Sequence, residues 1–261
     1  MKISVLASSS SGNASVIAAG GTAFLVDAGI SCLRICRGLE SCGLSAASLQ
    51  GIFITHEHED HIKGLGVLGK KCAAPVYCSR YLRNDLRCTT PATLHFIEPG
   101  SSLQVGDITV TPFSVSHDAL DPIGYIFEHN GVRLGYVTDT GYVSRQMEDI
   151  LQGVHALYIE SNYDEKMLHE SNRPWALIER IEGRWGHLSN EQAAELVRHV
   201  AHPGLQHVIL AHLSSECNTP TRAAKVMKDT LNELNLKTIL HTAHKDKPLA
   251  GVKISPYLST M

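Results

Sequence analysis

The stretch Thr55-His56-Glu57-His58-Glu59-Asp60-His61 follows directly on the apolar run Gly51-Ile52-Phe53-Ile54. It places three imidazoles and three carboxylates within six residues at the end of a predicted strand. Imidazole nitrogen and carboxylate oxygen suit zinc and the neighbouring divalent first-row metals, and one tetrahedral ion cannot use so many ligands. The stretch therefore predicts a site for two metal ions. The alternative is a solvated histidine-rich loop, but such loops seldom follow a buried strand.

Three later predicted strands each end in a single residue that can bind a metal, namely His117, Asp139 and His212. A lone histidine or aspartate beyond a strand is more often a turn residue or a helix cap. Three in series after the first motif favour a metal centre instead. Ligands on separate strand-end loops suit a dinuclear site, because rigid sheets hold them to the tolerance that metal geometry demands.

The composition leaves room for an enzyme with a sizeable core. The chain has 261 residues, of which 43% are hydrophobic, and this excludes the disordered and fibrous classes. The formal net charge of −3 provides no global basic field. A site for a polyanion must therefore be local.

The cysteines and the start of the chain favour a cytoplasmic protein without a membrane anchor. The seven cysteines contain no C-x-x-C pair, in a chain long enough not to need disulfides, so we assign them to the core of a protein in a reducing compartment. Residues 1–13 become polar too soon for a signal peptide, and no apolar run reaches membrane-spanning length.

The apolar pattern predicts strands followed by helices in each half of the chain. No linker or short repeat is present, so we expect one domain, residues 1–261, of the α/β class, with two sheets packed face to face and helices outside. A helix is expected after the histidine motif and another from Ser79. The other predicted elements are strands at 3–7, 14–19, 22–27, 51–54, 75–78, 94–97, 106–113, 124–128, 132–138, 156–160 and 208–211, and helices at 31–42, 189–199 and 219–234.

The order H-x-H-x-D-H, then His, Asp and His at strand ends, resembles the metallo-β-lactamase fold superfamily over nearly the whole chain. The resemblance implies an αβ/βα four-layer sandwich of two mixed β-sheets, with the metals at one edge. It also implies a hydroxide shared by the two ions as the nucleophile, with Asp60 among the catalytic residues. Carried over residue by residue, it assigns His56, His58 and His117 to one ion, Asp60, His61 and His212 to the other, and Asp139 to both.

Three further motifs resemble the YycJ/WalJ family of DNA exonucleases. They are L-A-S-S-S-S-G-N-A at 6–14, V-T-D-T-G at 137–141 and E-S-N-Y-D at 160–164. The segments 186–194 and 210–214 also resemble the nucleases of the superfamily, including the tRNA 3′-end endonucleases. The resemblance implies exonuclease action of the 5′-3′ type on DNA.

His187 is a candidate catalytic residue. In the nuclease branch, the equivalent histidine lies beside the metals without binding them and donates to the phosphate or to the departing oxygen. The alternative is that His187 helps to cap a helix, since Ser189 and Gln192 have the spacing of a capping box. Both roles can hold at once.

Two segments are candidate phosphate-binding sites. Residues 63–87 contain six basic residues and one acidic residue, and Arg80, Arg83 and Arg87 have the spacing of one helix face. A solvated helix face is the alternative. In the turn near the start, Ser10, Ser11 and Asn13 either cradle a phosphate or form an ordinary structural turn. Arg173, Arg180 and Arg184 form a further candidate, which Glu170, Glu179 and Glu182 weaken.

We therefore expect a phosphodiesterase with two zinc or manganese ions that acts on nucleic acid, DNA rather than RNA. The alternatives are a hydrolase of a small phosphodiester, a hydrolase of an ester, lactone or β-lactam, and a metal-binding protein that serves a partner. The chain has no room for the inserted domain with which some nucleases clamp a strand. Binding to the polymer is then either weak or strengthened by a homo-oligomer or a partner.

Overall fold

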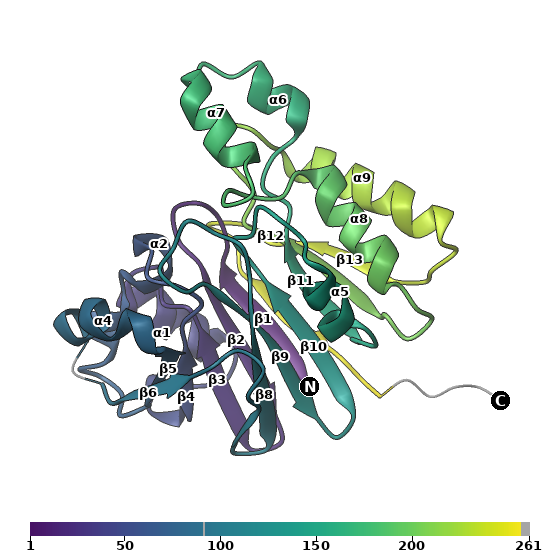
Figure 1. Cartoon of the computed structure of the whole chain (residues 1–261). Coiled ribbons are helices and arrows are strands. Elements are labelled where there is room, and N and C mark those ends of the chain that lie inside the picture. Colours follow the sequence, from purple (N-terminus) through teal and green to yellow (C-terminus); the bar gives the residue numbers. More distant parts are fainter. Residues whose placement is uncertain (91, 257–261) are drawn as a thin grey trace. The chain divides into compact units, whose positions relative to one another are not determined.

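The computed structural model describes residues 1–90 and 92–256, which divide into two compact units (Figure 1). The first unit consists of Met1–Pro112, Ala119–Ile123 and Ala243–Lys253. The second consists of Phe113–Asp118, Gly124–Thr242 and the residues from Ile254 on. In the described residues, no helix has the length and apolarity that crossing a membrane requires.

The first unit contains the strands that surround the histidine motif. The strands are β1 Lys2–Ala7, β2 Ala14–Ala19, β3 Thr22–Val26, β4 Gly51–Phe53, β5 Val76–Ser79, β6 Leu94–Ile97, β7 Leu103–Val105, β8 Ile108–Ser114, whose last two residues belong to the second unit, and β14 Leu249–Lys253. The helices are α1 Cys32–Ser41, α2 Glu59–Ile62, α3 Leu65–Leu68 and α4 Arg83–Thr89, with 3-10 turns η1 Ala46–Ser48 and η2 Arg80–Leu82.

The second unit contains the later strand-end candidates. Its strands are β9 Ile123–His129, whose first residue belongs to the first unit, β10 Val132–Val137, β11 Ala156–Glu160, β12 His207–Ala211 and β13 Ile239–Thr242. Its helices are α5 Arg145–Leu151, α6 Glu165–His169, α7 Trp175–Glu182, α8 Asn190–Val200 and α9 Pro220–Glu233. Apolar side chains of α5, α8 and α9 pack on β10, β11 and β12 to form its core.

In the described residues the strands form two mixed sheets of seven strands each, so the expected α/β class is confirmed. The orders are β14-β1-β2-β3-β4-β5-β6 and β13-β12-β11-β10-β9-β8-β7. Strands β3 to β6 are parallel to one another, and so are β10 to β13. Carboxyl ends of parallel strands meet at the same edge of a sheet. Each unit therefore gathers its strand-end residues at one edge.

Three predicted helices begin at the capping residues that the sequence offers for them. The side chain of Ser31 accepts the Arg34 N–H at the start of α1. Ser189 and Gln192 form the predicted capping box of α8, and Thr219 caps α9 with Pro at its first position.

The prediction missed several elements. Strands β7, β13 and β14 are short and only partly buried, so they lack the apolar runs that signal a strand. Helices α5, α6 and α7 have at most eight residues each. The single helix expected after the histidine motif is two helices of four residues, α2 and α3.

Candidate metal centre

In the first unit, Asp27 and Thr55 meet because the parallel strands β3 and β4 end side by side. Val26 pairs with Phe53 in the register of these strands. The Asp27 N–H donates to the Phe53 carbonyl over 2.8 Å, and the Thr55 N–H donates to Asp27 Oδ1 over 2.9 Å. Asp27 has a φ of 59°, a left-handed conformation that few residues other than glycine adopt. The strand end thus turns the Asp27 carboxylate onto the histidine motif.

Asp27 and Thr55 orient two of the predicted histidine ligands. The Nδ1–H of His61 donates to Asp27 Oδ2 over 2.8 Å. The Thr55 hydroxyl donates to the same carboxylate and lies 3.0 Å from Nδ1 of His56, from which it can accept. Both rings then carry their proton on Nδ1, which leaves Nε2 with the lone pair that a metal binds.

Asp27 is fully buried behind these histidines. Burial raises the pKa of its carboxyl above the usual range, and the contacts with His61 and Thr55 oppose that change only in part. A buried carboxylate that accepts from the far nitrogen of a ligating imidazole is a common support of protein metal sites. Asp27 therefore holds His61 in a fixed orientation.

Asp60, the carboxylate among the four predicted ligands of this unit, is positioned by the backbone of a glycine and an asparagine. The Asn13 N–H donates to the Asp60 carbonyl over 2.8 Å. A Cβ on Gly29 would lie 1.5 Å from the same oxygen, so only glycine permits this approach. The Asn13 side-chain amide lies 3.2 Å from Asp60 Oδ2 and 3.1 Å from His61 Nε2. Asn13, predicted to bind phosphate, thus contacts the predicted metal ligands.

We expect Asp27→Asn to weaken zinc binding by about 10- to 100-fold. If the asparagine oxygen keeps the hydrogen bond from the Thr55 N–H, the asparagine NH2 group faces His61. Nδ1 of His61 must then accept a hydrogen bond from that group, and the ring carries its proton on Nε2. That tautomer cannot bind a metal through Nε2. Competition with a chromophoric chelator measures the affinity. The matched control is Asp107→Asn, because the Asp107 carboxylate accepts the Gly21 N–H on a surface turn. This variant should leave the affinity for zinc unchanged. If both variants bind zinc with equal affinity, the role of Asp27 is contradicted.

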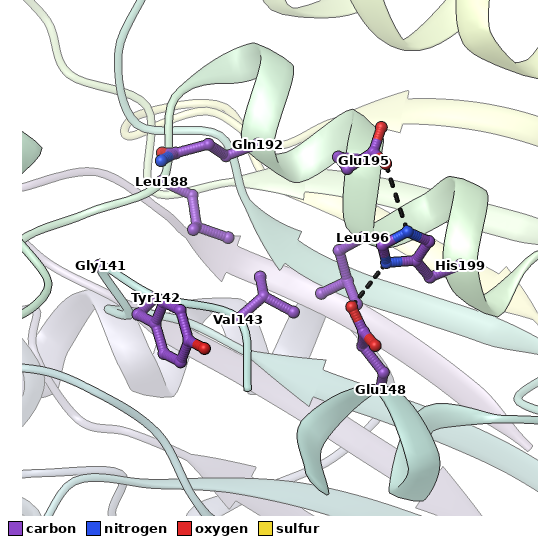
Figure 2. Close-up of a pocket in the computed structure, with 9 residues that line it drawn as sticks. All are labelled: Gly141, Tyr142, Val143, Glu148, Leu188, Gln192, Glu195, Leu196 and His199. Carbon is purple, nitrogen blue, oxygen red and sulfur yellow. Dashed lines mark hydrogen bonds and ion pairs between the residues drawn. The ribbon is translucent and has the colours of Figure 1, made fainter. Parts of the chain in front are cut away.

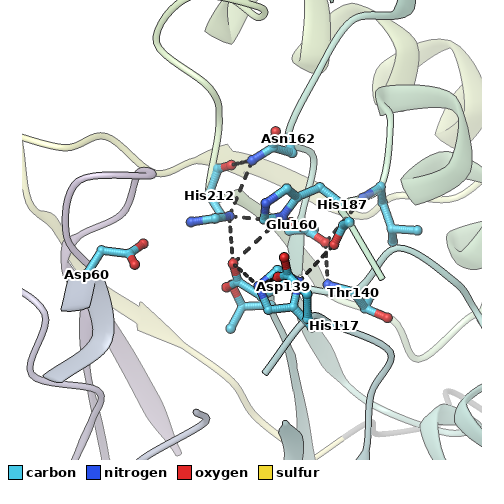
Figure 3. Close-up of polar contacts among 12 residues, drawn as sticks. Asp60, His117, Asp139, Thr140, Glu160, Asn162, His187 and His212 are labelled. Atoms are coloured by element: carbon cyan, nitrogen blue, oxygen red, sulfur yellow. Dashed lines mark hydrogen bonds and ion pairs between the residues drawn. The ribbon is translucent and has the colours of Figure 1, made fainter. Parts of the chain in front are cut away.

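In the second unit, residues at the ends of the parallel strands β10, β11 and β12 form a second cluster with one residue that follows β8 and one from the loop before α8 (Figure 3). It consists of His117, Asp139, Glu160, His187 and His212. Asp139 and His212 both have a φ of 50°, and such strained conformations concentrate at functional sites. Nδ1 of His212 lies 3.3 Å from Asp139 Oδ1.

Glu160, the last residue of β11, is fully buried and accepts hydrogen bonds on both oxygens (Figure 3). Oε1 accepts the N–H groups of Thr140 and Leu188 over 2.6 and 3.2 Å. Oε2 lies 3.0 Å from Nδ1 of His187 and 3.4 Å from Nδ1 of His212. A carboxylate has about four acceptor positions, so these four donors use its capacity. Glu160 therefore orients the two histidines and is not itself needed as a ligand.

The pKa of the Glu160 carboxyl agrees with its role in orienting His187 and His212. Burial alone would raise the pKa of the Glu160 carboxyl, but the interactions with His187 and His212 outweigh burial and lower it below the usual range. The group is therefore a carboxylate that can stabilise positive charge on either imidazole.

His117 is held by the loop that precedes His187. Its Nδ1–H donates to the Gly186 carbonyl over 3.0 Å, which directs Nε2 toward Asp139 Oδ1 at 3.9 Å. Burial lowers the pKa of His117 against the opposing effect of Asp139. The lowered pKa favours the neutral ring, which is the state that binds a metal.

His187 contacts the cluster through one side of its ring. Its Nδ1 lies 3.0 Å from Glu160 Oε2 and 3.7 Å from Asp139 Oδ1, and its side chain is 20% exposed. The capping box of α8 is complete with Ser189 and Gln192 alone. The His187 side chain therefore faces the carboxylates of the cluster, while part of it remains accessible.

Both clusters have the donors that divalent ions take. In the second unit, ligand atoms of Asp139, Glu160, His187 and His212 lie within 4.8 Å of one another. In the first unit, the ring centroids of His56 and His58 are 4.6 Å apart and those of His56 and His61 are 4.1 Å apart. Nitrogen and carboxylate oxygen at oriented positions suit a divalent metal.

The remaining predicted residues lie elsewhere. Ser10 and Ser11 are exposed in the turn after β1. The single basic helix face expected for three arginines is wrong at Arg80, because Ser79 accepts the Tyr81 N–H and starts the 3-10 turn η2. Arg80 pairs with Glu98 over 2.6 Å, and Arg83 is the first residue of α4. The side chain of Arg87 lies outside the described residues.

Sequence reasoning missed the two buried carboxylates Asp27 and Glu160. Each had a signal, since Asp27 ends the predicted strand 22–27 and Glu160 begins the E-S-N-Y-D motif. In the same motif, the Asn162 side-chain amide donates to the His212 carbonyl over 2.8 Å. Asn162 of this motif therefore supports the second cluster, to which Glu160 contributes its carboxylate.

Comparison with known proteins places these features in a family. The chain matches the family described as "Beta-lactamase superfamily domain" over residues 22–213. It is 38% identical to "Exodeoxyribonuclease YycJ" of Bacillus anthracis, covering 89% of this chain and 90% of that protein. It is 36% identical to "Exodeoxyribonuclease WalJ" of Streptococcus pneumoniae, covering 90% of each. The crystal structure of the metallo-β-lactamase fold protein YhfI from Bacillus subtilis matches with a TM-score of 0.73 at 16% identity, covering 95% of this chain and 97% of that one.

Proposed function

The chain belongs to the metallo-β-lactamase superfamily and, within it, to the YycJ/WalJ family, and on this premise we propose that it is a DNA exonuclease of the 5′-3′ type. Membership makes it a metal-dependent hydrolase; the substrate and direction are the proposal. The observation that carries it is the arrangement of His187, a partly exposed imidazole that Glu160 holds beside Asp139 and His212. Such a group supplies a proton donor next to predicted metal ligands.

The proposed cofactor is a pair of divalent ions, zinc or manganese. We assign His56, His58 and His117 to one ion and Asp60, His61 and His212 to the other, with Asp139 shared. When bound, such ions lower the pKa of a water molecule and neutralise charge on phosphoryl oxygens. Contacts within each unit support this assignment of ligands. In His56, His61 and His117, Nδ1 is hydrogen-bonded, so Nε2 is the nitrogen that can bind an ion.

The protein's own groups would then place and move a proton. Glu160 holds the Nδ1–H of His187, so the opposite nitrogen is the one that can donate. The carboxylate of Glu160 stabilises the imidazolium, which donates to the departing oxygen of the phosphodiester. Asp27 keeps His61 oriented throughout and takes no part in proton transfer.

An assay of substrate range tests this proposal. Purified protein with added zinc or manganese is incubated with end-labelled single- and double-stranded DNA and RNA, and separately with an ester. We expect stepwise loss of nucleotides from the 5′ end of DNA, and no loss after a chelator is added. Intact nucleic acids together with cleavage of the ester or of a small phosphodiester would overturn the choice of a nuclease.

We also propose a cytoplasmic location. Six cysteines are free thiols in the described residues, namely Cys32, Cys36, Cys42, Cys72, Cys78 and Cys217. A reducing compartment keeps thiols in this form. Cell fractionation would place the protein, and recovery outside the cytoplasmic fraction would contradict this part of the proposal.

A further inference from the structure

Three thiols of the first unit lie together beside α1 and the segment that follows α3. Cys32 and Cys36 are the first and fifth residues of α1, and side chains four residues apart on a helix lie on the same face. Their Sγ atoms are 4.0 Å apart. Cys72, which follows α3, packs in the same apolar cluster. We call Cys32, Cys36 and Cys72 the thiol cluster.

Glycine allows the segment before α1 to approach the start of α3. The N–H of Gly64, the residue before α3, donates to the Ala28 carbonyl over 2.7 Å. A Cβ on Gly64 would lie 2.1 Å from the Ile30 carbonyl oxygen, so any other residue would push the two segments apart. The Cys72 N–H donates to the Leu68 carbonyl at the end of α3 over 3.1 Å. The packing of α1 against α3 therefore positions all three thiols.

Burial separates the thiol cluster from most of the solvent. Cys32 is 6% exposed and Cys72 is 8% exposed, while Cys36 is partly buried. Burial raises the pKa of the Cys32 and Cys72 thiols, and the neighbouring Cys36 raises both further. Cys72 also raises the pKa of Cys32, whereas the Lys71 ammonium lowers it. Thiols that oppose one another's ionisation are stabilised when one shared cation replaces their protons.

The spacing of Cys32 and Cys36 suits a shared metal ion better than a disulfide. Residues four apart on a helix have Cβ atoms about 5–6 Å apart, whereas a disulfide needs about 3.8 Å. Two sulfurs bound to one ion at about 2.3 Å, with a trigonal angle of about 120° between the bonds, lie roughly 4.0 Å apart. The two Sγ atoms have this separation.

Sulfur ligands favour a different ion from those proposed for the histidine motif. Thiolates select soft ions such as Cu(I), whereas mixed imidazole and carboxylate sites suit zinc and manganese. A structural zinc site takes four ligands, and the thiol cluster offers three. One rotatable bond leads to the Cys72 sulfur, so this atom can turn toward the pair while the backbone stays in place. The number and kind of the ligands therefore match a soft monovalent ion.

We propose that the thiol cluster binds one Cu(I) ion through Cys32, Cys36 and Cys72. The three thiol protons are released to solvent when the copper–sulfur bonds form, and neither sulfur nor copper changes its oxidation state. Three thiolates around a monovalent ion leave an excess of negative charge, and the nearby Lys71 ammonium offsets part of it. This site is separate from the predicted ligands of the catalytic ions, so it does not depend on the proposed function.

Competition with the chromophoric Cu(I) chelator bicinchoninate tests the proposal. Reduced, zinc-loaded protein is titrated in the absence of oxygen, so that the histidine motif is already occupied. We expect the wild type to take about one Cu(I) ion per chain from the chelator and to keep its zinc. Ultraviolet charge-transfer absorption of copper–thiolate bonds should appear in step. No uptake of Cu(I), or release of zinc in proportion to the uptake, would overturn the proposal.

Cys36→Ala is the most informative variant, and Cys42→Ala is its matched control. Both side chains are partly buried, and Cys42 is the C-cap residue of the same helix, where the cap is made by its backbone. Loss of a group that only orients a ligand costs about 10–100-fold in metal affinity, so loss of a ligand should cost more than about 100-fold.

We expect this loss of Cu(I) affinity in Cys36→Ala, Cys32→Ala and Cys72→Ala, and wild-type affinity in Cys42→Ala. Circular dichroism and the unfolding midpoint verify that each variant is folded. Wild-type affinity in a folded variant of any of the three cluster residues would overturn the three-thiolate site.

Clusters that contain histidine provide the remaining controls. At the wall of a cavity in the second unit, His199 contacts Glu148 and Glu195 over 2.5 and 3.2 Å (Figure 2). Such carboxylate-rich groups favour harder ions, so His199→Ala should bind Cu(I) like the wild type. The double variant Asp60→Ala, His61→Ala should also keep its Cu(I). Loss of Cu(I) from either protein would place the ion outside the thiol cluster and overturn the proposal, whereas absence of nuclease activity in the wild type would refute only the proposed function.

Discussion

Replacing Glu160 by glutamine is expected to lower kcat on the order of a hundredfold and to destabilise the fold by about 3 kcal/mol. Oε1 of Glu160 accepts two backbone N–H groups, and Oε2 lies within 3.0 and 3.4 Å of Nδ1 of His187 and His212. A glutamine must point its NH2 group at one of these pairs of donors. Either two buried N–H groups lose their acceptor, or both histidines lose the group that orients them.

The loss of charge adds to the loss of hydrogen bonds. The glutamate carboxylate stabilises an imidazolium at His187, and a neutral amide cannot do so to the same degree. The decrease in kcat should therefore be larger than the decrease in the amount of folded protein can explain. The measurement is kcat on a labelled DNA end, compared at matched concentrations of folded protein, with urea unfolding for stability.

Glu182→Gln is the matched control for Glu160→Gln. Glu182 also contacts a histidine, since its Oε1 lies 2.5 Å from His169 Nε2, but this pair is partly exposed to solvent. Exposed pairs contribute little, so the control should stay within about 0.5 kcal/mol of the wild type and retain its kcat. If Glu160→Gln behaves like this control, Glu160 does not position the histidines of the second cluster.

The sequence predicted the candidate metal ligands because their signal is local. Each ligand follows an apolar run, so a strand end and a chemically suitable side chain are visible together. The three ligand positions His117, Asp139 and His212 were predicted at strand ends, and the structure has a strand ending shortly before each. Whether all seven residues bind metal stays a prediction.

The supporting carboxylates could not be predicted in the same way. Asp27 and Glu160 become informative only when the tertiary structure places a histidine 3.0 Å or less from their oxygens. Before that contact is known, an acidic residue after a strand has the pattern of an ordinary turn residue. Their burial depends on tertiary packing, which no local pattern encodes.

The helix face predicted for three arginines shows that a local sequence pattern can also predict an arrangement that the structure does not have. Spacings of three and four residues suggested one face for Arg80, Arg83 and Arg87, but the hydroxyl of Ser79 starts a 3-10 turn and Glu98 pairs with Arg80. Residues in such a turn do not share the direction of an α-helical face. In contrast, glutamates near Arg184 in the sequence weaken the prediction that this arginine binds phosphate, although in the described residues Arg184 pairs with none of them.

The double variant Asp60→Ala, His61→Ala is expected to bind less metal and to lose nuclease activity. Both residues are assigned to one ion, and His61 is the residue that Asp27 orients. The removal of His61 also deprives a buried carboxylate of its donor. Asp60→Asn, which keeps His61, separates the loss of a ligand from the loss of packing. Glu59→Ala, an exposed change in the same motif, is the control.

The most direct test of the metal-dependent nuclease assignment measures two quantities on each of these proteins. They are the number of metal ions bound per chain and the rate at which a 5′-labelled DNA end is digested. We expect about two ions per wild-type chain, full activity in Glu59→Ala, and activity reduced to background in both Asp60→Asn and the double variant, with about one ion left in the double variant. Unchanged digestion by a folded double variant, or digestion by wild type freed of metal, would contradict the account.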